Sequence, residues 1–369
     1  MTFQSMSAAR WASALALSLL VPAASLAQSG SASEAQPGLV FLQRLQQAAH
    51  QLDYEGVYTY QQGAVLLSSR IVHLADAHGE RQRVEVLDGR THREFVRHND
   101  KVQSLFPELR MVLVEQGTSE YFPVLFSGSP QDLGRLYRVQ LEAEPGRVAG
   151  RVCDIAHIVP RDALRWRYWI CADAETGLLL KVQTRDDAGG VLEQVAFSEV
   201  DIGADVDATL VEPRHDTAAW QHVSTGEPVD LAASGWHIVA PTGFTPISQL
   251  RRKLKHQQEV HQMVLSDGLA AVSVFIERVD ARHGAATGAG NVTTGAAPAQ
   301  GVQSEGQADS AARQGASHAK PGRAGAVQYG ATNIYSRQEG DFWLTVLGEV
   351  PAETVRQVAE ATTYRLRQP

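Results

Sequence analysis

The fold is decided by residues 153–171, which read CDIAHIVPRDALRWRYWIC. Two runs rich in β-branched and aromatic residues, 147–159 and 165–172, flank the turn-forming residues 160–163, Pro-Arg-Asp-Ala. Such runs on either side of a turn predict an antiparallel β-hairpin, here centred on Asp162. A symmetric hairpin places Cys153 and Cys171 opposite each other.

The chain begins with an export signal. Arg10 supplies a positive charge, residues 11–21 are apolar, and Ser25-Leu26-Ala27 has the small-x-small pattern of a cleavage site. The apolar run is shorter than the roughly 20 residues that a membrane-spanning helix needs. We expect residues 1–27 to be removed after Ala27, leaving a soluble protein in the bacterial periplasm.

Export changes how the two cysteines of the chain are interpreted. In an oxidising compartment, Cys153 and Cys171 can pair across the hairpin. Two buried free thiols remain the alternative. A redox-active pair is disfavoured, because the spacing is not C-x-x-C.

Composition narrows the class of protein. The 369 residues are 44% hydrophobic and 20% charged, which is ordinary for a soluble globular protein. Removing residues 1–27 takes away Arg10 alone among charged residues, so the net charge changes from −8 to −9. An acidic balance argues against nucleic acid as a partner.

The mature chain divides into two predicted domains. In the first, residues 38–204, a helix over 39–52 precedes ten or so strand-like runs, which predicts a curved antiparallel sheet that closes only partly. A polar linker over 205–228 leads to a smaller α+β domain over 229–369. The fold class is therefore α+β, mainly antiparallel β.

An insertion over residues 281–327 interrupts the second domain. Of its 47 residues, 9 are Gly and 14 are Ala, and none is aromatic, Leu or Ile. Such a segment buries too little apolar surface to offset the entropy of ordering it. We therefore predict a disordered loop that joins two strands of one sheet.

Motifs for catalysis are missing from the sequence. It holds no G-x-S-x-G nucleophile elbow, no phosphate-binding loop and no dinucleotide fingerprint. His256 and His261 are spaced so that neither a helix nor a strand brings them onto one metal ion. We predict no catalytic residue, no metal ligand and no cofactor, so an enzyme ranks last among the functions considered.

Two features indicate binding. The first is the apolar segment 121–126, YFPVLF, which can cap a lipid-sized cavity at the open side of the sheet. Plain core packing is the alternative for this segment. Its candidate lipid-cavity residues are Tyr121, Phe122, Leu125 and Phe126.

The second feature is a cationic run over residues 251–256 in an otherwise acidic protein. It can meet acidic partner segments or lipid phosphates, and a solvated face is the alternative. Its candidate partner-binding residues are Arg251, Arg252 and Lys253.

In their order along the chain, these pieces resemble the RseB/MucB family of periplasmic sigma-factor regulators. Each motif is weak alone, but their order over two domains is specific. The motifs are Leu52-Asp53-Tyr54-Glu55-Gly56, Arg70-Ile71-Val72-His73, Leu87-Asp88-Gly89 with Arg93, Glu94 and Arg97, Tyr168-Trp169-Ile170 with Asp173, Glu175-Thr176-Gly177-Leu178 with Lys181, Leu192-Glu193-Gln194, Gly243-Phe244, Arg251-Arg252, Ser266-Asp267-Gly268-Leu269, Val272-Ser273-Val274-Phe275 and Gly348-Glu349-Val350-Pro351.

The resemblance implies a fold and a function. The first domain would be a half-open β-barrel lined by its N-terminal helix, similar to the lipoprotein carriers LolA and LolB. The protein would bind the periplasmic domain of a single-pass, RseA/MucA-like anti-sigma factor and shield it from proteolysis. Lipid or lipopolysaccharide would release it during envelope stress. The disulfide and the long insertion depart from the family pattern.

A periplasmic lipid or lipoprotein carrier is the alternative function. A carrier needs the cavity of the first domain but has no use for the second domain, so the second domain favours the regulator. The sequence leaves open the identity of the lipid, the regulon and whether the protein forms a homo-oligomer.

Overall fold

A computed structural model describes residues 37–89, 91–116, 122–203, 205–224, 226–253, 259–279 and 325–365. The predicted signal peptide, Tyr121 and residues 281–324 of the predicted insertion lie outside this part of the chain. No helix in the described ranges is long and apolar enough to cross a membrane. Residues Gln36–Pro369 form one compact unit built on two large β-sheets.

The first sheet comprises thirteen strands among the described residues. They are β1 (Tyr54–Gln62), β2 (Val65–Asp76), β3 (Gly79–Val86), β4 (Arg93–His98), β5 (Lys101–Phe106), β6 (Met111–Gln116), β7 (Tyr137–Leu141), β8 (Gly146–Val148), β9 (Arg151–Pro160), β10 (Arg167–Asp173), β11 (Leu179–Arg185), β12 (Val191–Ile202) and β13 (Gln221–Ser224). Their order is β13-β6-β5-β4-β3-β2-β1-β12-β11-β10-β9-β7, with β8 also paired to β9. The end strands β13 and β7 do not pair with each other, so the sheet is open, as the sequence predicts.

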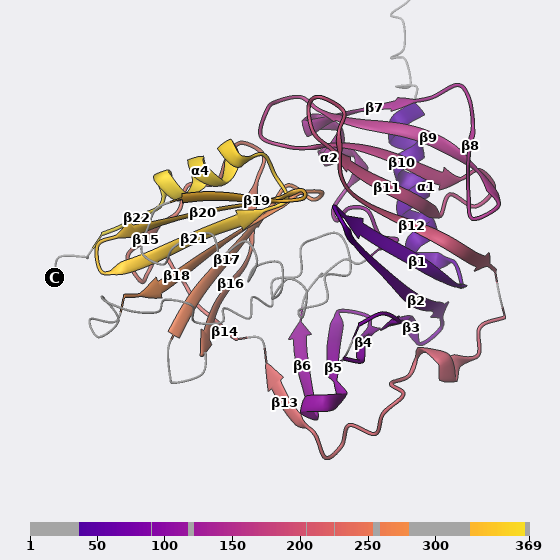
Figure 1. Cartoon of the computed structure of the whole chain (residues 1–369), viewed down its shortest axis with the longest axis horizontal. Helices are drawn as coiled ribbons and strands as arrows, with labels where there is room; N and C mark the ends of the chain where they lie inside the picture. Colours follow the sequence, from indigo (N-terminus) through magenta and orange to yellow (C-terminus); the bar gives the residue numbers. More distant parts are fainter. Residues whose placement is uncertain are drawn as a thin grey trace, which may run out of the picture. The chain divides into compact units, whose positions relative to one another are not determined.

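Helix α1 (Pro37–Gln51) covers one face of this sheet, which we call the inner face (Figure 1). Its buried side chains recur at helical spacing and join those of the strands in one core. The predicted helix over 39–52 is therefore present, shifted by one or two residues. The buried residues of the helix are Phe41, Leu42, Leu45, Ala48 and Ala49.

The second sheet has seven strands within the described ranges, in the order β14-β16-β17-β18-β21-β20-β19. Helix α4 (Ala352–Ala361) packs on it through Val355, Val358 and Ala359, beside the strands drawn in yellow in Figure 1. A short pair, β15 (Trp236–His237) with β22 (Thr363–Tyr364), adjoins it. The seven strands are β14 (Glu227–Pro228), β16 (Thr245–Lys253), β17 (Glu259–Ser266), β18 (Ala271–Arg278), β19 (Gly325–Tyr329), β20 (Thr332–Glu339) and β21 (Phe342–Gly348).

The region expected as a linker, 205–228, carries structure of its own. A short 3-10 helix, η2 (Ala208–Val211), buries Val211, and β13 pairs with β6 in parallel, unlike the antiparallel pairs elsewhere in the first sheet. Because β13 is a polar edge strand held by backbone pairing, its sequence shows no alternation of apolar residues.

The second domain differs from expectation at three places. Residues 251–253 of the cationic run lie within strand β16, and residues 325–327 of the expected insertion begin strand β19. Pro351 followed by Glu353 is typical of a helix start, and the sequence predicts a closing helix over 351–366. Helix α4 instead ends at Ala361, because Tyr364 lies in β22 and its ring centroid is 4.9 Å from that of Trp236.

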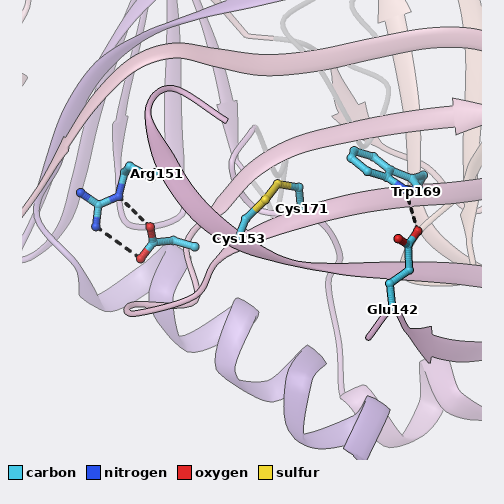
Figure 2. The surroundings of a disulfide bond; sticks show 6 residues. Glu142, Arg151, Cys153, Trp169 and Cys171 are labelled. Atoms are coloured by element: carbon cyan, nitrogen blue, oxygen red, sulfur yellow. Dashed lines mark hydrogen bonds and ion pairs between the residues drawn. A yellow bond between two sulfur atoms is a disulfide. The ribbon is translucent and has the colours of Figure 1, made fainter. Parts of the chain in front are cut away.

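The hairpin of β9 and β10 carries the disulfide between Cys153 and Cys171 (Figure 2). The expectation that these residues lie opposite each other is wrong. Cys153 pairs in register with Asp173, and Cys171 pairs with Ile155, so the bond joins diagonal neighbours whose Cα atoms are 5.5 Å apart. The turn is centred one residue later than Asp162, because residues 164–166 leave the strand to contact the second sheet.

Candidate functional site

The apolar segment over 122–126 lies in the core of the first sheet. Phe122, Leu125 and Phe126 are at most 2% exposed. The Phe122 ring centroid is 5.0 Å from those of Tyr58 on β1 and Phe197 on β12. The segment therefore crosses the inner face, and three of the four candidate lipid-cavity residues lie together there.

This segment fills the space that the sequence expected it to line. A cavity of only about 10 Å³ remains between Phe122, Val124 and Leu125 on one side and strands β11 and β12 on the other. That volume holds about one water molecule. A lipid can enter the inner face only if the segment moves.

The chain beyond the segment is held by two hydrogen bonds. The Ser127 N–H donates to the Gly268 carbonyl at 2.8 Å, and the Gln46 side-chain amide donates to the Gly128 carbonyl at 2.8 Å. Helix α2 (Pro130–Leu136) follows directly. Gly268 belongs to the second domain, so its hydrogen bond with Ser127 joins the end of the apolar segment to that domain.

A buried carboxylate adjoins this core. Glu193 on β12 accepts hydrogen bonds from the Tyr60 hydroxyl at 3.2 Å, the Gln62 amide at 3.4 Å and the Thr184 hydroxyl at 3.3 Å. Burial raises the pKa of Glu193 to about 7, although the three donors oppose the shift.

A second buried carboxylate, Glu349, follows strand β21 of the second sheet. Burial, and then the charge of Glu193, raise the pKa of Glu349 well above its usual range. Its Oε1 atom has no hydrogen-bond partner within the described structure. Because Glu193 has three donors, we infer that the pair holds one charge on Glu193 while Glu349 is protonated.

A buried ion pair lies at the hairpin turn. The Arg165 guanidinium donates to a carboxylate oxygen of Asp267, to Asp162 Oδ2 at 2.5 Å and to the Thr242 carbonyl at 2.7 Å. It also lies 4.6 Å from the centroid of the Phe244 ring. Removing one partner of such a pair leaves an uncompensated buried charge and costs about 3–5 kcal/mol.

The neighbouring turn residues also bond to the second domain. The Trp166 indole N–H donates to the Ala331 carbonyl at 2.8 Å, and the Thr354 hydroxyl donates to the Leu164 carbonyl at 2.9 Å. Together with Arg165, these contacts account for the displaced centre of the hairpin.

The candidate partner-binding residues do not form a single patch. Strand alternation directs Arg251 and Arg252 to opposite faces of β16. Arg251 forms a 2.7 Å ion pair with Glu227, and the side chain of Lys253 lies outside the described structure. Their role in partner binding stays a prediction.

Metal chemistry finds no support in the described residues, where no group of three His, Cys, Asp or Glu side chains could hold an ion.

Comparison with known families extends over both sheets. The family model of the MucB/RseB N-terminal domain matches residues 38–215. The model of the MucB/RseB C-terminal domain matches residues 230–308 and 313–363. The chain belongs to the MucB/RseB family. The resemblance inferred from the sequence motifs is thus confirmed.

Two curated relatives cover most of the chain. The sigma factor AlgU regulatory protein MucB of Pseudomonas aeruginosa is 29% identical over 338 residues, 89% of this chain and 91% of the relative. The sigma-E factor regulatory protein RseB of Salmonella typhimurium is 26% identical over 353 residues, 93% and 96% of the two chains. Both relatives are regulatory proteins by name, which agrees with the class of protein that the sequence motifs predict.

Solved structures agree in fold. A complex of Pseudomonas aeruginosa MucA and MucB matches with a TM-score of 0.65 and 25% identity, covering 90% of this chain and all of that chain. MucB in complex with MucA(peri) matches with a TM-score of 0.62 and 24% identity, covering 89% and 99%. The predicted class, α+β with mainly antiparallel sheets, is confirmed.

Sequence reasoning missed the buried carboxylate pair and the Arg165–Asp267 ion pair as sites. A signal was present, because Glu193, Asp267 and Glu349 all lie in motifs that carried the family resemblance. Charged residues inside an apolar strand run, such as Glu193, or directly after one, such as Asp267 and Glu349, point to buried polar contacts. Their partners are visible only in the folded chain.

Proposed function

We propose that this protein is a periplasmic negative regulator of a sigma factor. It binds the periplasmic segment of a membrane-spanning anti-sigma factor and shields that segment from regulated proteolysis. The observation that carries this proposal is the match, over both sheets, to MucB as it occurs in a MucA/MucB complex.

Features of the chain support the location. Residues 1–27 have the pattern of an export signal, and the Cys153–Cys171 bond suits the oxidising conditions outside the bacterial cytoplasm. A membrane-spanning anti-sigma factor exposes a segment to that same compartment.

Release is the second part of the proposal. A lipid or lipopolysaccharide-type amphiphile displaces the apolar segment 122–126 from the inner face and thereby loosens the grip on the partner. If the lipid binds the free protein more tightly than the complex by a given factor, linkage requires that saturating lipid weaken partner binding by that same factor. A tenfold weakening requires about 1.4 kcal/mol of differential affinity.

The carrier alternative is less well supported by the geometry. A carrier needs a standing cavity for its cargo, whereas only about 10 Å³ remains beside Phe122 and Leu125. Displacement of the segment suits a sensor, because the energy needed to move it sets a threshold for the lipid.

The partner-binding test uses the mature chain and the purified periplasmic segment of the anti-sigma factor from the same genome. We expect saturable binding by calorimetry and protection of the segment from proteolysis. Replacing Arg251 and Arg252 by Glu should weaken binding most at low salt. Absence of binding by the folded wild-type chain would refute the proposal.

The release test follows hydrogen exchange in the complex while lipopolysaccharide is added. Exchange should rise in residues 122–128 as the partner dissociates, while strand β10 stays protected. Polar substitutions at Leu125 or Phe126 are unsuitable here, because both side chains are buried and the first domain would be destabilised. If the partner dissociates while residues 122–128 remain protected, this segment is not the sensor.

A further inference from the structure

The outer face of the first sheet, opposite α1, carries cations around one indole ring. Trp169 lies on β10, and its ring centroid is 5.6 Å from Lys181 Nζ and 5.6 Å from Arg185 Cζ, both on β11. Arg167 pairs in register with Arg185. We call these four residues the Trp169 cluster; Figure 2 shows Trp169 on the strand that also carries Cys171.

Two carboxylates lie near the cluster, and each already bonds one of its four members. Glu142 Oε1 accepts from the Trp169 indole N–H at 3.3 Å, a bond drawn in Figure 2, and it lies 2.6 Å from His157 Nε2. Asp187 forms a 3.2 Å ion pair with Arg167. Glu142 thus positions the indole, and Asp187 compensates one of the three cations.

The other two cations are uncompensated. No carboxylate in the described ranges forms an ion pair with Lys181 or Arg185, and the Arg185 guanidinium donates to the neutral Gln183 amide oxygen. Burial, and then the charge of Arg185, lower the pKa of Lys181. The structure therefore holds two mutually repelling cations on one ring, a cost that a bound anion would offset.

A depression of about 370 Å³ opens beside the cluster. Of the cluster, Arg167 and Arg185 line it, whereas Trp169 and Lys181 do not. The rest of the lining is Gln140, His157, Val159, Tyr168, Asp187, Ala188 and Gly189. This volume falls within the range of about 300–1,000 Å³ that is usual for ligand sites. Because Arg167 is paired with Asp187 and His157 with Glu142, Arg185 is the basic side chain of this lining that can meet an anionic occupant.

We propose that the Trp169 cluster and its depression bind an acidic, extended segment of a partner protein. The cations are spread over two strands, and alternate side chains of an extended segment are about 6.6 Å apart, so several carboxylates can meet several cations. This inference does not depend on the proposed regulatory function.

Segments of this chain outside the described structure do not have the required chemistry. Residues 280–324 contain four basic residues, Arg282, Arg313, Lys320 and Arg323, against three acidic ones, Asp280, Glu305 and Asp309. Residues 28–36 contain a single acidic residue, Glu34. The occupant is therefore another molecule.

The test titrates the mature chain with a fluorescent oligo-glutamate peptide of about ten residues, which is about 33 Å long when extended. The variant is Lys181→Gln with Arg185→Gln. The matched control, Lys101→Gln with Arg135→Gln, makes the same change in net charge at exposed positions far from the cluster in sequence. Anisotropy is measured at about 0.02 M and about 0.3 M ionic strength, and melting curves verify folding.

We expect the cluster variant to bind the peptide about tenfold more weakly than the wild type at low ionic strength, with a reduced salt dependence. The control should change binding by less than about threefold. Equal losses in the two variants would assign binding to net charge and overturn the proposal.

A second arm compares vesicles of phosphatidylglycerol with vesicles of phosphatidylcholine in co-sedimentation. If the wild type binds the anionic vesicles through Lys181 and Arg185 but does not bind the peptide, the site serves a membrane and the proposal is wrong. Peptide binding that the cluster variant loses, without vesicle binding, supports it.

Discussion

Strands β10 to β12 present two faces with different surroundings. Successive side chains along each strand point alternately to the inner face and to the outer face. On the inner face, Val182 and Val195 pack against the segment 122–126, whereas Trp169 and Lys181 on the outer face meet solvent. The inner face is thus sensitive to apolar volume and to protonation of Glu193. The outer face is sensitive to ionic strength, so one sheet presents two surfaces with separate physical controls.

The largest expected effect is on the inner face. Leu125→Ala should lower the free energy of unfolding by about 2–5 kcal/mol, because Leu125 is 1% exposed and the substitution leaves a cavity. Leu66→Ala is the matched control on β2, where the side chain is 59% exposed and the loss should stay within about 0.5 kcal/mol. Denaturant titration measures both, and equal losses would show that the segment is not part of the core.

The outer face is not exposed along its whole length. Cys153 and Cys171 lie on the same face as Trp169, but both are fully buried. The strand β8 covers them, and a Cβ atom at Gly146 would lie 3.1 Å from Cys153 Sγ. Replacing both cysteines by Ala should cost about 3 kcal/mol in the chain-entropy model. Denaturant titration measures this loss.

The bond itself is checked by mass spectrometry of unreduced periplasmic protein, which should contain no alkylatable thiol. Two alkylatable thiols in the native pool would contradict the bond.

Turn chemistry and strand composition predict the hairpin from the sequence, but they do not predict its register. The register depends on Arg165 and Trp166, whose partners Asp267 and Ala331 are about 100 or more residues away in the chain. Long-range contacts of this kind leave no local signal. The same reason explains why the sequence did not reveal the parallel pairing of β13.

The candidate site shows a similar limit. The sequence identified Phe122 and Leu125 as functional candidates, but apolar residues have the same pattern whether they line a cavity or fill it. The structure distinguishes these cases through the small remaining volume. For Arg251 and Arg252, the sequence showed a run of charge, whereas strand geometry separates the two side chains.

The next largest expected effect is a pH dependence of stability that arises from the buried carboxylates Glu193 and Glu349. The folded-state pKa values of Glu193 and Glu349 are raised above the unfolded value of 4.5, that of Glu193 to about 7. For Glu193, the stability that follows from the raised pKa is complete below pH 4.5 and is lost as pH rises through about 7. The pKa of Glu349 is raised in the same direction, so its contribution is also lost toward high pH. Glu349→Gln removes one carboxyl, so its stability should increase relative to that of the wild type between pH 5 and pH 8.

The control for this prediction is Glu339→Gln, because Arg337 lowers the pKa of Glu339. Stability from a lowered pKa is present above the unfolded value and lost on acidification, so this variant should be less stable than the wild type at pH 8. Melting temperatures between pH 5 and pH 8 decide the matter, and a pH-independent difference for Glu349→Gln would contradict the buried pair.

The smallest effect is expected on the outer face. Lys181→Gln removes a cation that Arg185 repels, so stability should rise slightly at low salt, by less than about 0.5 kcal/mol. Arg356→Gln in α4 is the opposite case, because Arg356 pairs with Glu353 at 2.6 Å and with Glu360 at 3.1 Å, and its loss should destabilise slightly. Both differences should shrink at high salt, where exposed charges are screened. If Lys181→Gln instead lowers the melting temperature at every ionic strength, its aliphatic stem packing on Trp169 outweighs the repulsion, and the cluster is a structural contact rather than an unfilled anion site.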